Sequence, residues 1–133
     1  KTARIIYCRP QLKGRSLDEL TPVGKVWRTG ANEVPEITFY KDVKFGNTKL
    51  KAGSYALLTI PEKDSYTIII SKDLNVSGST PYNDKNEVAR LKVPVTAGEE
   101  SLEAFSMVFT KDEKGIVLNL GWDKVRVAVP FTE

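Results

Sequence analysis

The sequence predicts an all-β, single-domain antiparallel β-sandwich, jelly-roll-like or immunoglobulin-like, with about eight to ten strands and at most one short helix. Apolar and polar residues alternate at period two over most of the second half, turn-forming residues separate the apolar runs, and helical periodicity is almost absent. A chain of 133 residues is long enough for one hydrophobic core. We therefore expect residues 1–133 to form one domain.

The period-two alternation is clearest in four runs of the second half. In each run every second residue is apolar, so one face of an extended strand would enter the core and the other would meet solvent. The segment Asp112-Glu113-Lys114-Gly115 carries hairpin-turn residues, and Gly121-Trp122-Asp123 indicates either a tight turn or a bulge. We expect adjacent antiparallel strands at residues 88–95, 103–110, 115–122 and 124–131.

Two earlier runs, at residues 55–60 and 66–71, are more continuously apolar. This pattern is typical of central strands that are covered on both faces. Residues 61–64 between them read as a hairpin turn. A helix is indicated only near Ser16 and Glu19, which stand at capping-box spacing, and Pro22 limits it to about one turn.

The residue types that are missing exclude several kinds of site. The chain has no histidine, which excludes His-based catalysis and His-ligated metals, and its single cysteine, Cys8, excludes an internal disulfide and a thiolate metal cluster. We expect no metal and no cofactor, and we expect Cys8 to be buried and unreactive. The net charge of +3 is too small for a nucleic-acid-binding domain, and no apolar run is long enough to span a bilayer.

Positive charge is concentrated at the beginning of the chain. Residues 1–28 have a net charge of +5, against +3 for the whole chain. Three of these cations, Arg9, Lys13 and Arg15, lie around Gly14 and could form an anion-binding loop. The alternative is a solvated basic loop.

A second polar string follows at residues 24–33. Trp27 beside Lys25 could form a stacking platform for a sugar ring or a planar ligand, or Trp27 could be a core residue with Lys25 at the rim. Arg28 and Glu33 could grip and orient an anionic ligand, or they could form an ion pair that closes their own loop. Asn32 could make an Asx turn there.

Both strings resemble a bacterial family of uncharacterised single-domain proteins that are frequent among secreted or envelope proteins. The resemblance covers nearly the whole chain and implies a fold and an envelope location rather than a reaction. It is carried mainly by Tyr7-Cys8-Arg9-Pro10, Lys13-Gly14-Arg15 and Gly24-Lys25-Val26-Trp27-Arg28-Thr29-Gly30-Ala31-Asn32-Glu33.

We therefore expect a secreted or periplasmic, non-catalytic binding module for an anionic or carbohydrate-like ligand, with its export signal removed. One alternative is a structural or protein-interaction domain in which the same residues only lock a loop. The other is a carboxylate-based hydrolase, although no spacing singles out a pair among Glu33, Asp73, Asp84 and Asp123. The expected ligand-binding residues are Arg9, Lys13, Arg15, Lys25, Trp27, Arg28, Asn32 and Glu33.

Overall fold

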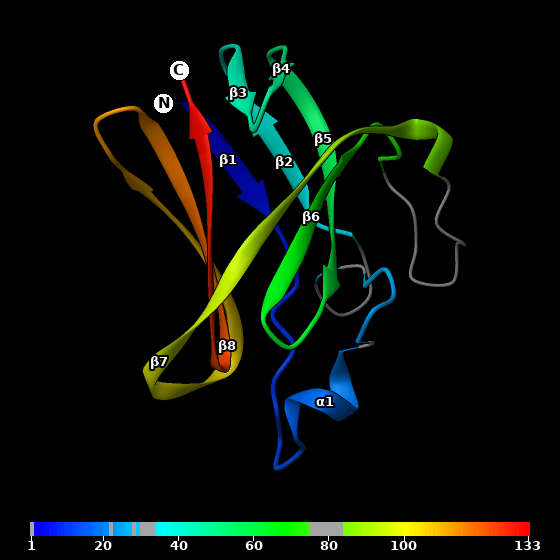
Figure 1. Cartoon of the computed structure of the whole chain (residues 1–133), viewed down its shortest axis with the longest axis vertical. Helices are drawn as coiled ribbons and strands as arrows, with labels where there is room; N and C mark the ends of the chain where they lie inside the picture. The colour runs from blue at the N-terminus through cyan, green and yellow to red at the C-terminus, as the bar shows by residue number, and fades with distance from the viewer. Residues whose placement is uncertain (1, 22, 28, 30–33, 75–83) are drawn as a thin grey trace.

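A computed structural model describes residues 2–21, 23–27, 29, 34–74 and 84–133 of the chain (Figure 1). These residues form an all-β domain with eight antiparallel strands in the order β1-β2-β5-β6-β7-β8-β3-β4, and the predicted fold class is confirmed. No helix in the described part is long and apolar enough to cross a membrane. The strands are β1 (Ala3–Ile6), β2 (Glu36–Phe39), β3 (Val43–Phe45), β4 (Thr48–Leu50), β5 (Gly53–Pro61), β6 (Ser65–Ser71), β7 (Glu87–Lys111) and β8 (Gly115–Thr132).

The long strand β7 connects the two halves of the sheet. Its first part pairs with β6 as far as Pro94, and from Val95 onward it pairs with β8. Figure 1 shows β7 crossing in front of β6 and then turning back alongside β8. The hydrophobic core lies between the sheet portions on either side of this crossing, so one bent strand contributes to both layers of the sandwich.

The four strands expected in the second half are in fact two continuous ones. The runs 88–95 and 103–110 both belong to β7, and the runs 115–122 and 124–131 both belong to β8. Bulges take the place of the turns that would have separated them, because the β7–β8 register shifts between Ala97 and Leu102 and again between Leu102 and Ser106. The predicted hairpin turn at residues 112–115 is confirmed.

Arg126 stabilises the bulged bend of the β7–β8 pair, at the opposite end from the turn at residues 112–115. Its guanidinium group donates hydrogen bonds to the carbonyl oxygens of Glu100 (2.5 Å), Asp123 (2.7 Å) and Val125 (2.9 Å). A Cβ atom at Gly98 would lie 2.5 Å from the guanidinium carbon. A side chain at Gly98 would therefore displace the Arg126 guanidinium group from these hydrogen bonds.

Strands β5 and β6 are covered on both faces, as their continuous apolar runs predicted. Their inner side chains join the main core, while Ala56, Leu58 and Ile69 form a second cluster on the outer face. Val26 and Val34, from the segment that follows the short helix, pack against this outer cluster. Val26 of the second motif, and Val34 directly after that motif, therefore lie against the sheet.

The predicted short helix is α1 (Leu17–Leu20), a single turn, and a second short element is the 3-10 turn at Asp84–Asn86. Glu19 accepts hydrogen bonds from the Ser16 backbone N–H (3.2 Å) and hydroxyl (3.0 Å), as the capping-box spacing indicated. Both bonds lower the pKa of Glu19, the one from the Ser16 backbone more than the one from the Ser16 hydroxyl. Leu17 and Leu20 pack against the main core, so α1 covers one end of the sandwich (Figure 1).

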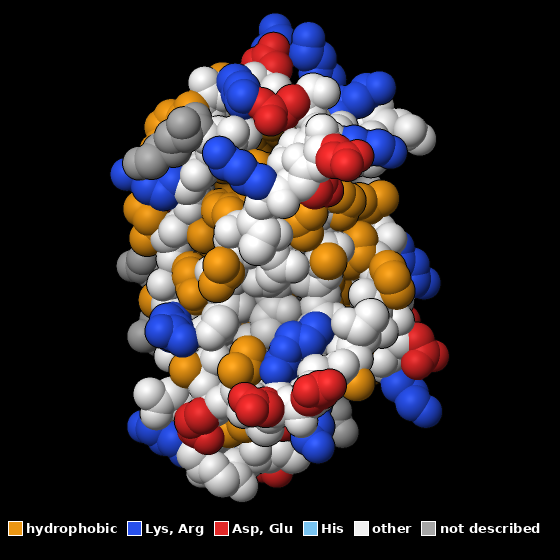
Figure 2. All heavy atoms as spheres, turned by 90° about the vertical axis from the view of Figure 1, so that its left-hand side faces the viewer, with side chains coloured by type: hydrophobic (Ala, Val, Ile, Leu, Met, Phe, Trp, Pro, Cys, Tyr) orange, Lys and Arg blue, Asp and Glu red, His pale blue; other side chains and the backbone are white. Residues whose placement is uncertain are grey.

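The surface of the β7–β8 side carries apolar and charged groups in separate zones. Figure 2 shows hydrophobic side chains gathered in the middle of this face, with Lys, Arg, Asp and Glu concentrated toward its two ends. Among the described residues, the large hydrophobic side chains that are most exposed are Ile6, Val23, Tyr40 and Val108. They come from separate segments of the chain.

Candidate functional site

The first motif, here called segment 7–15, attaches to the edge of β7 through side chains. The Tyr7 hydroxyl accepts a hydrogen bond from the Met107 N–H (2.9 Å) and lies 3.3 Å from the Met107 carbonyl oxygen, to which it donates. The Arg9 Nε donates to the Phe105 carbonyl oxygen (3.1 Å), and its Nη2 donates to Ser106 Oγ (3.0 Å). These two side chains satisfy backbone groups that a neighbouring strand would otherwise pair.

Backbone pairing continues the attachment toward residue 12. The Phe105 N–H donates to the Pro10 carbonyl oxygen (2.9 Å), and the Leu12 N–H donates to the Glu103 carbonyl oxygen (3.0 Å). The Lys13 N–H then donates to the Glu103 carboxylate (2.7 Å). Segment 7–15 is thus fixed to β7 over most of its length.

The basic loop at the end of this segment is held by its own arginine. Arg15 donates from Nε to the Leu12 carbonyl oxygen (2.9 Å) and from Nη2 to the Gln11 carbonyl oxygen (3.0 Å). The chain turns at Lys13 and Gly14, which both have positive φ (51° and 79°). Arg9, Lys13 and Arg15 are exposed, and none of them forms an ion pair with an acid in the part of the chain that the structure describes.

The second motif, here called segment 24–29, attaches to the edge of β5 through its backbone. Trp27 and Thr59 exchange N–H···O hydrogen bonds of 2.6 and 3.1 Å, and the Gly24 N–H donates to the Pro61 carbonyl oxygen (2.8 Å). Gly24 has a φ of +77°, which glycine adopts without the strain of a side chain. This pairing extends the sheet beyond the point where β2 ends.

Trp27 lies in the core, with 8% of its surface exposed. Its ring contacts Phe105 edge-on (centroids 5.4 Å apart) and stacks on Trp122 (5.9 Å, planes at 12°). Of the two placements that the sequence allowed, the structure has the buried one, so this ring offers no open face for stacking a sugar. Lys25, two residues earlier, is exposed.

Thr29 is the strained residue of this segment. It is fully buried with a φ of 58°, a conformation that β-branched residues rarely adopt. Its hydroxyl donates to the Trp27 carbonyl oxygen (3.1 Å) and lies 3.2 Å from Thr59 Oγ1. Strained positions of this kind concentrate at functional sites, and Thr29 stands directly before the Gly-Ala-Asn-Glu string.

Three of the expected site residues, Arg28, Asn32 and Glu33, lie outside the described residues. The ion pair between Arg28 and Glu33 therefore stays a prediction. The remaining five are placed: Arg9 and Arg15 bind backbone carbonyls, Trp27 is in the core, and Lys13 and Lys25 are exposed.

The two motifs meet at one core residue. Tyr7 contacts Phe105 edge-on at 5.8 Å between ring centroids, and Trp27 contacts the same ring at 5.4 Å. Since Phe105 belongs to β7 and Trp27 pairs with β5, this aromatic contact links the two strand edges to which the motifs attach. The two motifs are separate in the sequence, but in the fold a residue of each contacts Phe105.

Of the carboxylates considered for hydrolysis, Asp73 and Asp84 belong to the surroundings of one 3-10 turn, and Asp123 lies in β8. Asp73 accepts a hydrogen bond from Asn86 Nδ2 (2.6 Å), Asp123 accepts one from Ser101 Oγ (2.7 Å), and Asp84 begins the 3-10 turn. Glu33 is not described. No group of three or more Cys, Asp or Glu residues in the described ranges could hold a metal ion.

Cys8 differs from expectation in one respect. Its side chain is partly exposed rather than buried. The neighbours Tyr7 and Arg9 both bind β7, and alternation along an extended chain directs the residue between them away from that strand. Its reactivity stays a prediction.

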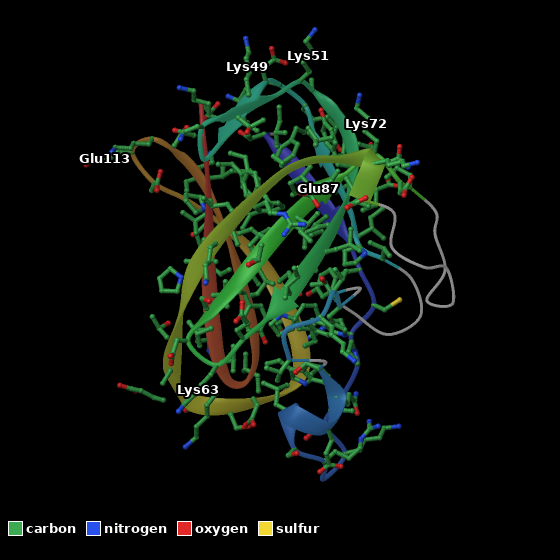
Figure 3. The ribbon with its side chains drawn as sticks, turned by 45° about the vertical axis from the view of Figure 1, so that its right-hand side comes forward. Lys49, Lys51, Lys63, Lys72, Glu87 and Glu113 are labelled. Carbon is green, nitrogen blue, oxygen red and sulfur yellow. The ribbon has the colours of Figure 1, made fainter. Side chains whose placement is uncertain are left out.

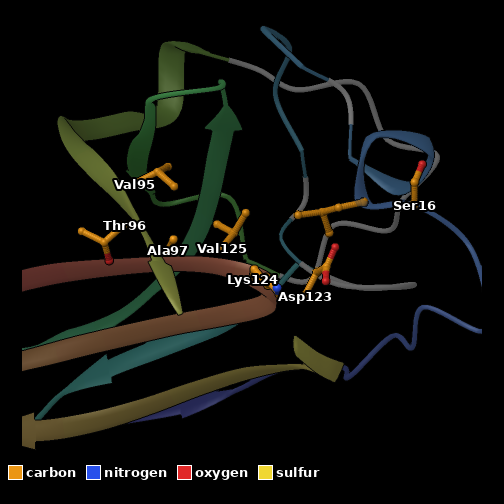
Figure 4. Close-up of a pocket in the computed structure, with 8 residues that line it drawn as sticks. Ser16, Val95, Thr96, Ala97, Asp123, Lys124 and Val125 are labelled. Carbon is orange, nitrogen blue, oxygen red and sulfur yellow. The ribbon is translucent and has the colours of Figure 1, made fainter. Parts of the chain in front are cut away.

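Two grooves beside α1 were missed by the sequence analysis. One, of about 450 Å³, lies between Ser16 and Leu17 on one side and the β7–β8 bend on the other (Figure 4). The other, of about 420 Å³, lies between α1 and the β5–β6 turn. Both are lined by Leu17 and Val125. Their walls come from several distant segments, and no local sequence pattern signals such an assembly.

Comparison with known proteins gives a match that covers nearly the whole chain. No curated protein and no solved structure matches it. One family model does, and it spans residues 1–131, which includes both motif segments and all eight strands except the last residue of β8. The chain belongs to this family, which is described as protein of unknown function (DUF2911).

Proposed function

We propose that this protein is a non-catalytic binding domain whose exposed lysines in the two motif segments contact an anionic or carbohydrate-like ligand. One observation carries the proposal. The side chains and backbone groups that attach each segment to the sheet leave the Lys13 and Lys25 ammonium groups exposed, without an acid partner among the described residues. Because the backbone of these loops is already ordered, a ligand that binds their cations has to order only the lysine side chains.

Arg28, Asn32 and Glu33 complete the proposed site by their position in the sequence. In the sequence they follow Trp27, whose backbone is paired with Thr59, and they stand on either side of the strained Thr29. In the binding hypothesis, Arg28 grips a carboxylate or phosphate of the ligand with its planar fork of donors, and Glu33 orients it.

The competing function is a structural or protein-interaction role, and a specific observation favours it. Arg9 and Arg15 use their guanidinium groups on backbone carbonyls of their own fold. If every motif cation served in this way, the segments would only close two sheet edges. The two hypotheses therefore differ in the role of Lys13 and Lys25.

Isothermal titration calorimetry with a galacturonic acid trimer, which carries carboxylates, and with the uncharged galactose trimer separates these hypotheses. We expect the acidic trimer to bind more tightly, and its affinity to fall as sodium chloride is added. The double variant Lys13→Ala/Lys25→Ala should weaken this binding by about tenfold, because two exposed charge contacts are lost. Its melting temperature without ligand should equal that of the wild type.

The matched control is Lys44→Ala/Lys51→Ala, which removes the same charge from exposed positions of β3 and the β4–β5 turn. Figure 3 shows Lys51 at the end of the molecule opposite Lys63. This control should bind like the wild type. Equal affinity for the acidic trimer in all three proteins, or no binding by the wild type, would contradict the proposal and favour the structural role.

We also propose an envelope location, secreted or periplasmic, on the strength of the family resemblance. Fractionation of cells that express the complete gene tests it. Recovery in the periplasm or the medium is the expected result, and recovery in the cytoplasm alone would contradict it.

A further inference from the structure

The groove between α1 and the β5–β6 turn has the size of a small-molecule site. Its volume of about 420 Å³ falls within the range of ligand pockets. It lies at the end of the sandwich that carries α1, where Figure 3 also places Lys63. The lining residues are Leu17, Thr21, Val23, Pro61, Glu62, Lys63, Tyr66 and Val125.

Tyr66 provides the groove with a polar group on a largely buried ring. Only 6% of its surface is exposed, and its ring also lines a small internal void of about 10 Å³ beside Trp27 and Trp122. Its hydroxyl forms no hydrogen bond with any residue that the structure describes, and no fully buried polar side-chain atom in that part lacks a partner. The hydroxyl is therefore not completely enclosed, and the groove is the larger of the two hollows that Tyr66 lines.

The hydroxyl acts as a donor over the whole physiological range. A phenol of ordinary pKa is already protonated at neutral pH, and burial raises the pKa of Tyr66 further, to about 12. An uncharged acceptor, such as a carbonyl or ether oxygen, can reach this donor among apolar walls without the cost of burying a charge.

The other side chains that line the groove indicate the polarity and charge of a ligand that would fit it. Leu17, Val23, Pro61 and Val125 are apolar, and Val23 is 58% exposed. The charges at this groove, Glu62 and Lys63, are opposite and adjacent in sequence, so they give the groove no net charge. An uncharged ring would cover the apolar walls without desolvating an unpaired charge.

We propose that this groove is a binding site for an uncharged, ring-bearing small molecule whose acceptor oxygen takes a hydrogen bond from the Tyr66 hydroxyl. The site goes beyond the function proposed above. None of its lining residues is among the motif cations, and either site can exist without the other.

The test uses benzamide, a neutral ring with a carbonyl acceptor, and toluene, which lacks the acceptor. In ¹H–¹⁵N correlation spectra of the whole protein, benzamide should shift the amide signals of Leu17, Val23 and Lys63. Tyr66→Phe, which removes only the hydroxyl, should weaken benzamide binding by about three- to tenfold and leave toluene binding unchanged.

Two further variants make the result specific. Tyr55→Phe removes another tyrosine hydroxyl, one that donates to the Lys51 carbonyl oxygen away from the groove, and should bind benzamide like the wild type. Val23→Ala shortens an exposed wall and should weaken benzamide and toluene alike by about two- to threefold. Absence of shifts in the wild type, or equal benzamide affinity in Tyr66→Phe and the wild type, would overturn the proposal.

Discussion

Segments 7–15 and 24–29 both extend a strand edge through backbone pairs, but the side chains that hold them differ. In segment 7–15 two polar groups, the Tyr7 hydroxyl and the Arg9 guanidinium, bind β7 beside the backbone bonds of Pro10 and Leu12. Segment 24–29 is held to β5 by a backbone pair and by a tryptophan buried in the core. A cation beside an aromatic residue is a poor guide to exposure, because strand pairing decides which way each side chain points. The cost of removing a side chain should therefore differ strongly between the two segments.

The largest effect is expected at Trp27. Trp27→Ala removes a ring that contacts Phe105 and Trp122, and it should lower the free energy of unfolding by about 3–5 kcal/mol. Urea denaturation followed by circular dichroism measures this loss. The control Lys25→Ala, at an exposed position of the same segment, should change stability by less than about 0.5 kcal/mol. A loss below about 1 kcal/mol in Trp27→Ala would mean that segment 24–29 is not anchored through the core.

A loss of stability at high pH is expected from Tyr66, which lines the same internal void as Trp27. Because burial raises the pKa of Tyr66 from 10.0 to about 12, the folded protein keeps this proton where the unfolded chain releases it. The contribution is fully present below pH 10 and is lost as the pH rises from 10 to 12, by about 2–3 kcal/mol.

Denaturation curves between about pH 9 and pH 12 measure this loss, with Tyr66→Phe as the control. The variant cannot ionise at this position, so its stability should fall less steeply over the same range. Parallel curves for the two proteins would show that Tyr66 titrates alike in the folded and unfolded states.

A smaller effect is expected at Tyr7, whose hydroxyl binds the backbone of β7. Tyr7→Phe keeps the ring against Phe105 but leaves the Met107 N–H and carbonyl without this partner, and it should cost about 1–2 kcal/mol. Hydrogen exchange at the Met107 amide should become faster than in the wild type. Unchanged exchange there would indicate that water replaces the hydroxyl at no cost.

The smallest effect is expected at Arg9. The Arg9 side chain, which donates hydrogen bonds to Phe105 and Ser106, is exposed. Arg9→Ala should therefore lower the free energy of unfolding by only about 0.5–1 kcal/mol, as measured by thermal or urea unfolding. Ser106→Ala removes one of the same two bonds from the other side and should cost less. If Arg9→Ala matched Trp27→Ala in magnitude, the contrast between the two segments would fail.

Local patterns predicted much of this fold. The Ser16–Glu19 spacing predicted α1, and the continuous apolar runs predicted that β5 and β6 are covered on both faces. The alternation in the second half predicted strands but not their number. A bulge and a turn can both interrupt alternation, and only the pairing of β7 with β8 around Arg126 distinguishes them here.

The candidate site was predictable only in its residue types. The sequence identified a run of cations around Trp27, but it left open whether this ring would face solvent or the core. That choice depends on the pairing of Trp27 with Thr59 and on the position of Phe105, both far away in the chain. Cys8 is partly exposed for a related reason, since its neighbours bind β7.

The sequence by itself determined that this protein is a β-sheet domain without a histidine or an internal disulfide, because composition and side-chain alternation are properties of the chain alone. The tertiary structure decided which cations are used on backbone carbonyls, which are left exposed, and that a groove forms beside Tyr66. These features arise where segments distant in sequence meet, and no local pattern encodes such contacts.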